Sequence, residues 1–145
     1  MSSSTAPTDR YIAATDFYVR YAETDAQGVV HHASYIVWLE EARSHYARSV
    51  GSDYADFERA GYFMSVIAVE IRYRAPARYG SRVVISCWVQ ALKSRTVTFG
   101  YEVRDVAENT LHATASTEHI CITREGQVVA WPTDWKQKLA DGLPS

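Results

Sequence analysis

The sequence predicts an α+β fold in which a curved, antiparallel, five-stranded sheet wraps around one long central helix. Three observations support this prediction: one alternating segment near the start, a single long helical stripe after it, and then four alternating segments. A lone long helix on a flat sheet leaves one apolar face uncovered, whereas a strongly curved sheet encloses the helix.

The first strand is predicted over residues 15–22, where apolar and polar positions alternate. Phe17, Val19 and Tyr21 share one face of this strand. A polar stretch with Gly28 near its centre follows. This stretch is expected to form a loop between the strand and the helix.

The long helix is predicted to begin near His32, where the apolar period changes. One helical stripe then follows: Tyr35, Trp38, Leu39, Ala42 and Tyr46. Gly51 is a plausible stop, and Ser52 or Asp53 can cap a further short helix that ends at Gly61.

Four strands are expected in the second half of the chain. They cover residues 63–73, 82–92, 96–104 and 111–123, and the breaks between them are mostly short and turn-like. Short breaks favour an antiparallel meander, and Thr133 is expected to cap a last helix over 133–140. The complete layout is the hotdog arrangement, in which one sheet face often stays apolar, so we expect oligomers.

Composition and charge narrow the class of protein. The 145 residues suit one domain, which we place at 15–145 after a disordered leader at 1–14. The net charge of −2 gives no electrostatic footprint for nucleic acid or an anionic membrane. No secretory signal or membrane-spanning stretch is found, and Cys87 and Cys121 are expected to be reduced core residues of a cytoplasmic protein.

Chemistry is concentrated at the junction between the first strand and the helix. Asp25 follows the strand, and Gly28 can adopt a left-handed conformation that folds the loop back toward the helix start near His32. The first N–H groups of a helix are unpaired and carry partial positive charge. A carboxylate that faces such donors across a pocket is a plausible hydrolytic site, because the N–H groups stabilise an oxyanion while the carboxylate attacks or activates water.

Simpler interpretations of these residues remain open at this point. A loop aspartate such as Asp25 is usually a turn former, and Tyr21 would ordinarily belong to the core. His31 and His32 have no third ligand at helical spacing, so they are weak evidence for a metal site. The residues alone support a helix-in-sheet domain with a polar junction.

The stretch 19–43, VRYAETDAQGVVHHASYIVWLEEAR, resembles the signature of the 4-hydroxybenzoyl-CoA thioesterase family. The similar group comprises bacterial acyl-CoA thioester hydrolases, including the Tol–Pal-associated thioesterase. The resemblance extends over roughly residues 15–130 in the order of its strands. It implies a hotdog fold that hydrolyses acyl-CoA thioesters without a metal or cofactor.

The resemblance also assigns roles to residues. Asp25 matches the catalytic carboxylate, as nucleophile or general base, and the backbone N–H of His32 matches the oxyanion donor. The side chains of His32 and Tyr21 match groups implicated in the bacterial hydrolases. Five further residues are candidates for binding the substrate: Gly28, Val29, Glu40, Lys93 and Arg95.

Two of these assignments have ordinary alternatives. Glu40 can meet the acyl group or belong to a solvated helix face. Lys93 and Arg95 can grip CoA phosphates from their turn or form an ordinary charged turn. Other basic residues are the next candidates for the phosphates: Arg72, Arg74, Arg78 and Arg82.

Other functions within the same fold were weighed against hydrolysis. A hydroxyacyl dehydratase would use a histidine in a proline-rich segment, and residues 31–35 contain no proline. A non-catalytic acyl-CoA-binding module remains an alternative. We expect a homodimer or a dimer-of-dimers homotetramer with the pocket at a subunit junction. The sequence leaves the acyl-chain preference open.

Overall fold

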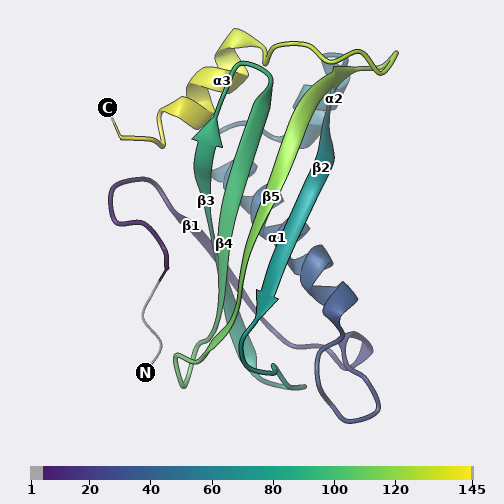
Figure 1. The fold of residues 1–145 in the computed structure, drawn as a ribbon, viewed down its shortest axis with the longest axis vertical. Helices are drawn as coiled ribbons and strands as arrows, with labels where there is room; N and C mark the ends of the chain where they lie inside the picture. Colours follow the sequence, from purple (N-terminus) through teal and green to yellow (C-terminus); the bar gives the residue numbers. More distant parts are fainter. Residues whose placement is uncertain (1–4, 145) are drawn as a thin grey trace.

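The computed structural model describes residues 5–144. Its strands are β1 (Ala13–Tyr18), β2 (Tyr62–Tyr73), β3 (Arg82–Leu92), β4 (Thr96–Asp105) and β5 (Leu111–Thr123). Its helices are the 3-10 turn η1 (Tyr21–Glu23), α1 (His32–Ser49), α2 (Tyr54–Arg59) and α3 (Thr133–Ala140). The strands form one antiparallel sheet that curves around α1, so the predicted hotdog arrangement is confirmed (Figure 1).

The order of strands across the sheet is β1-β3-β4-β5-β2. The predicted meander is correct for β3, β4 and β5 but wrong for β2, which pairs with β5 instead of β3. The connection at 74–81 makes this order feasible, because it needs to cross only about 14 Å between strand positions. On its way it hydrogen-bonds the loop before α1, where Ala77 and Gly28 carbonyls accept the N–H groups of Val30 and Tyr79 at 2.9 and 3.1 Å.

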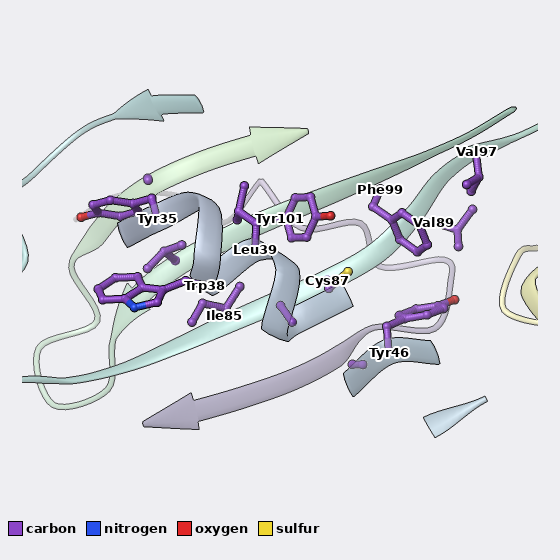
Figure 2. Packing of buried hydrophobic residues seen from close by; sticks show 14 of the residues in the cluster. Tyr35, Trp38, Leu39, Tyr46, Ile85, Cys87, Val89, Val97, Phe99 and Tyr101 are labelled. Carbon is purple, nitrogen blue, oxygen red and sulfur yellow. The ribbon is translucent and has the colours of Figure 1, made fainter. Parts of the chain in front are cut away.

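The core lies between α1 and the concave face of the sheet. Figure 2 shows Trp38, Leu39 and Tyr46 of α1 among side chains of β3 and β4, including Ile85 and Phe99. The helical stripe predicted for α1 is therefore the face that the helix buries.

Asp53 caps α2 by accepting the N–H of Ala55, as the sequence suggested.

Both cysteines belong to this core. Cys87 and Cys121 are free thiols and have no exposed surface. Burial raises the pKa of the Cys121 thiol to about 11, so the thiol stays protonated near neutral pH. The two residues contribute to core packing, as expected from the sequence.

The first strand differs from its prediction at both ends. It begins at Ala13 and ends at Tyr18, which pairs with Arg82 at the start of β3. After Tyr18, Val19 still hydrogen-bonds Ser81 and Gly80, and Tyr21 lies in η1 with 77% of its surface exposed rather than on a buried strand face. Thr24 closes this turn by donating its backbone N–H to the Tyr21 carbonyl at 3.1 Å.

The chain termini also differ in detail from expectation. Residues 1–4 of the expected leader lie outside the described residues, whereas Ala13 and Ala14 form part of β1. Before them, the Arg10 guanidinium donates to the Val89 and Gln90 carbonyls at 3.1 and 3.2 Å. The structured part of the chain therefore starts before residue 15.

The last helix begins at the predicted residue, but its N-cap residue differs from the predicted one. Thr133 is the first residue of α3, and the N-cap position belongs to Pro132, which has no capping side chain. The proline ring sets an extended backbone immediately before the helix, which starts the helix without a side-chain hydrogen bond. Within residues 5–144, no helix is long and apolar enough to cross a membrane.

Candidate active site

The loop between η1 and α1 is a tight turn around Asp25. The backbone N–H of Asp25 donates to the Val29 carbonyl at 2.8 Å, and Gly28 N–H donates to the Asp25 carbonyl at 3.0 Å. Gly28 has a φ of +75°, the left-handed conformation predicted for it. The turn returns the chain directly to the start of α1.

The same turn fixes the Asp25 carboxylate. Its Oδ1 atom accepts the N–H groups of Gln27 and Val29 at 2.8 and 3.1 Å. These hydrogen bonds lower the pKa of Asp25, and the nearby charges of His31 and Arg78 act in the same direction. Among residues 5–144, no group donates to Oδ2, so one oxygen of an ionised carboxylate remains free for chemistry.

The start of α1 provides unpaired donors. His31 is the N-cap residue, with an extended backbone and no side-chain hydrogen bond to the helix. The backbone N–H groups of His32 and Ala33 have no acceptor within the described part of the chain. Unpaired N–H groups at a helix N-terminus suit an anion or a developing oxyanion.

One cavity brings the carboxylate and these donors together. Its volume is about 350 Å³, and its lining residues are Asp25, Val29, Val30, His31, His32 and Ala33. A neighbouring cavity of about 230 Å³ shares Val29, Val30 and His32 and extends to Tyr35, Tyr73 and Arg74. The structure therefore places Asp25, Val29 and His32 in one concave site.

Tyr73 is a residue of this site that sequence reasoning missed. Its ring stacks on the His32 imidazole, with centroids 4.4 Å apart and an angle of 25° between the planes. Its hydroxyl donates to the His32 carbonyl at 3.3 Å. Tyr73 is the last residue of β2, and only the unpredicted pairing of β2 with β5 brings it to the start of α1.

Glu23 is a second missed residue, and it anchors the junction. Its carboxylate accepts the Trp38 indole N–H at 2.6 Å and the Arg20 guanidinium at 2.7 Å. Its backbone carbonyl accepts the His31 N–H at 2.9 Å. Burial favours a higher pKa for Glu23, but the hydrogen bonds from Arg20 and Trp38 outweigh it and lower the pKa. Glu23 thus holds the N-cap residue in place.

Tyr21 and Glu40 lie outside the Asp25 cavity. The Tyr21 ring meets Tyr79 edge to face, with centroids 5.7 Å apart, on the exposed surface near the junction. Glu40 lines a different cavity of about 170 Å³, together with Arg43 and Tyr54. The structure does not bring either side chain to Asp25 within one chain.

Lys93 and Arg95 lie at the opposite end of the molecule from Asp25. They belong to the turn between β3 and β4, where the Ser94 carbonyl accepts the backbone N–H of Trp131 at 2.9 Å. This end of the sheet faces the C-terminal end of α1, about 27 Å along the helix from His32 (Figure 1). By contrast, the backbone of Arg78 forms an isolated β-bridge with Val29, beside the site.

No metal cluster accompanies the site. Within residues 5–144, no group of three or more His, Cys, Asp or Glu side chains could hold a metal ion. The groups that line the Asp25 cavity include a carboxylate, two histidines and the backbone N–H groups at the start of α1.

Comparisons with known proteins identify the family of the chain. Residues 19–139 match the model of the thioesterase-like superfamily. The chain belongs to this family. The predicted family resemblance is thus confirmed.

Individual relatives support the same assignment. The chain is 33% identical over 115 residues to a putative acyl-CoA thioesterase YneP of Bacillus subtilis, covering 79% of this chain and 83% of that protein. It is 32% identical over 106 residues to the acyl-CoA thioester hydrolase YbgC of Escherichia coli O157:H7, covering 72% and 77%. The DHNA-CoA thioesterase structure from Staphylococcus aureus is 30% identical and superimposes with a TM-score of 0.83, covering 88% and 87%.

Proposed function

We propose that this protein hydrolyses an acyl-CoA thioester to a free acid and CoA at the junction between η1 and α1. The observation that carries the proposal is the single cavity shared by the Asp25 carboxylate and the unpaired N–H groups at the start of α1. The relatives named as acyl-CoA thioesterases support the choice of a CoA thioester as substrate.

The reaction begins with the thioester carbonyl oxygen on the His32 N–H. Carboxylate attack by Asp25 gives a mixed anhydride and releases CoA thiolate, and water then cleaves the anhydride. Alternatively, Asp25 removes a proton from water, which attacks the carbonyl directly and expels the same thiolate. Both routes place negative charge on the carbonyl oxygen, where a preorganised N–H donor contributes about 10²–10³ in rate. Both also need an ionised Asp25, which the lowered pKa supplies.

Two side chains are proposed to assist. The His32 imidazole is aligned by the Tyr73 ring and lines the cavity, so it is placed to orient water or protonate the leaving thiolate. The exposed Tyr21 ring lies outside the cavity and would meet a part of the substrate that extends beyond it. Gly28 shapes the binding turn, and Val29 lines the wall of the cavity.

Assembly into a homodimer or homotetramer is part of the proposal. The basic turn that holds Lys93 and Arg95 lies at the opposite end of the chain from the Asp25 cavity. It can therefore serve only the Asp25 cavity of a second copy. The edge strand β2 and the helix α1 support such assembly, because they expose the large apolar side chains of Ile67 and Val37. A second copy on this edge would cover them.

Release of CoA from a panel of acyl-CoAs tests the proposal. Purified protein treated with a chelator is expected to release free thiol from at least one aliphatic or aromatic acyl-CoA, without added cofactor. Binding of acyl-CoA without thiol release would favour the non-catalytic binding module. Loss of water from a hydroxyacyl-CoA with an intact thioester would favour the dehydratase.

The CoA substrate and the two buried free thiols support a cytoplasmic location.

A further inference from the structure

A further cavity lies between α1, α2 and β2, separate from the Asp25 site. Its volume is about 170 Å³, and its lining residues are Glu40, Arg43, Ser44, Tyr54, Phe57, Glu58 and Met64. Arg43 is only 8% exposed, whereas Glu40 and Glu58 are exposed. The cavity therefore has a buried cation in its wall and carboxylates at its solvent side.

The Arg43 guanidinium is incompletely satisfied. Its Nη1 donates to the Tyr101 hydroxyl at 3.2 Å, and that hydroxyl also hydrogen-bonds the Thr117 hydroxyl at 2.6 Å. Its Nε is buried and has no partner, and within residues 5–144 no carboxylate forms an ion pair with Arg43. An arginine cannot shed its charge, and a buried charge is costly unless it is paired. The Arg43 guanidinium therefore retains hydrogen-bond donor capacity for an anion.

An exposed apolar strip leads from the Asp25 site toward this cavity. Tyr73, Val69 and Val66 share the concave face of β2 by their pairing with β5, and Ile36 is exposed on α1 one turn after His32. Arg43 lies eleven residues after His32, about 16 Å along the helix axis. An extended chain of about 13 covalent bonds has this length.

We propose that the Arg43 cavity binds a carboxylate at the far end of the acyl group, so that the preferred substrates are long ω-carboxyacyl-CoA thioesters. This inference rests on the proposed thioester hydrolysis. The acyl chain would lie along the strip between α1 and β2, and its terminal carboxylate would accept hydrogen bonds from the Arg43 guanidinium. Such charge-assisted bonds are the strong class.

Glu40 and Glu58 oppose the anion but do not cancel the attraction. Both carboxylates are in contact with water, which screens their repulsion, whereas the Arg43 charge acts from inside the protein, where screening is weak. Glu40 therefore provides a test of this proposal, because its carboxylate lines the same cavity and repels a bound carboxylate. Removing its charge should strengthen the binding of a carboxylate.

The experiment compares kcat/KM for CoA thioesters of two acids of equal length, one ending in a carboxylate and one in a methyl group. The wild-type protein is expected to favour the carboxylate-ended substrate by about tenfold or more at the length that reaches Arg43. Arg43→Met should abolish this preference, Arg43→Lys should retain part of it, and Glu40→Gln should increase it. The ratio within one variant does not depend on the fraction of protein that is folded.

The outcomes distinguish this inference from the proposed function. A wild-type protein that hydrolyses the methyl-ended substrate as well as or better than the carboxylate-ended one overturns the carboxylate site while hydrolysis itself stands. A preference that survives Arg43→Met, or that falls in Glu40→Gln, overturns it as well. If the protein hydrolyses neither substrate and no other acyl-CoA, that result contradicts the proposed function instead.

Discussion

Asp25 and Val29 hold each other through two hydrogen bonds: the Asp25 N–H donates to the Val29 carbonyl at 2.8 Å, and the Val29 N–H donates to Asp25 Oδ1 at 3.1 Å. The backbone of the turn therefore positions the carboxylate, without help from another side chain. An asparagine at residue 25 could accept the same bonds through its amide oxygen. The catalytic role of Asp25 can thus be tested without dismantling the turn.

The backbone donor at the start of α1 can be tested separately from the imidazole. His32→Ala keeps the N–H and is expected to lose less hydrolytic activity than Asp25→Asn. His32→Pro removes the N–H and should lower kcat by a further factor of about 10²–10³. Proline suits this position because residue 32 opens the helix and His31 before it is extended, with φ −62° and ψ 144°.

Thermal unfolding provides the control for this pair of variants. Similar melting temperatures for His32→Pro and His32→Ala would show that the helix start is intact. Equal kcat values in two such folded variants would show that the His32 N–H does not stabilise the oxyanion. A His32→Ala variant as inactive as one lacking the Asp25 carboxylate would instead assign the main role to the imidazole.

The basic turn is expected to act across a subunit boundary. Replacing Lys93 and Arg95 with alanine should raise KM for acyl-CoA with little change in kcat, because phosphate contacts are similar in the ground and transition states. The effect should shrink at high salt. Steady-state kinetics at two ionic strengths checks both expectations.

Mixed oligomers locate the turn that serves each site. Co-assembly of the Lys93→Ala/Arg95→Ala chain with an Asp25→Asn chain should restore a low KM, because an intact Asp25 would meet an intact turn from the other copy. No restoration in verified mixed oligomers would assign the turn to its own chain or to the solvent. Sedimentation of a fully active monomer at micromolar concentration would contradict assembly altogether.

His119 should make stability depend on pH. Burial and the neighbouring Arg43 charge lower the pKa of His119 from 6.5 to about 3. The unfolded chain therefore binds the extra proton between these values, so stability is fully present above pH 6.5 and falls as the pH decreases. At pH 5, protonation of His119 in the unfolded chain should lower the free energy of unfolding by about 2 kcal/mol relative to its value well above pH 6.5.

Urea unfolding of wild type and His119→Asn from pH 5 to 7.5 measures this contribution. The variant should lose less stability than the wild type over that range, because it lacks the group whose pKa is lowered by folding. Parallel pH profiles for wild type and His119→Asn would show that His119 is not responsible.

The parts of the fold that local pattern governs were predictable. The stripe from Tyr35 to Tyr46 repeats at the helical period, and the structure buries that face. The left-handed Gly28 and the return of Asp25 to the helix start also follow from a short stretch of chain. Such features depend on neighbouring residues, so one sequence is sufficient to predict them.

Features that depend on distant pairing were not predictable. The placement of β2 beside β5 brings Tyr73 onto His32, and no periodicity in either segment indicates that pairing. The same holds for Arg43 and Tyr101, which are 58 positions apart and meet inside the core. Arg43 is a charged residue next to the predicted apolar stripe, and its burial is visible only in three dimensions.

The most direct test of the account is CoA release by Asp25→Asn at saturating acyl-CoA, measured beside the matched variant Asp53→Asn. Asp53 is a second loop aspartate whose carboxylate accepts a backbone N–H, at the N-terminus of α2, far from the proposed chemistry. We expect Asp25→Asn to lower kcat by about 10²–10⁴ with an unchanged melting temperature, whereas Asp53→Asn stays near wild type. Wild-type turnover in a folded Asp25→Asn protein would contradict it.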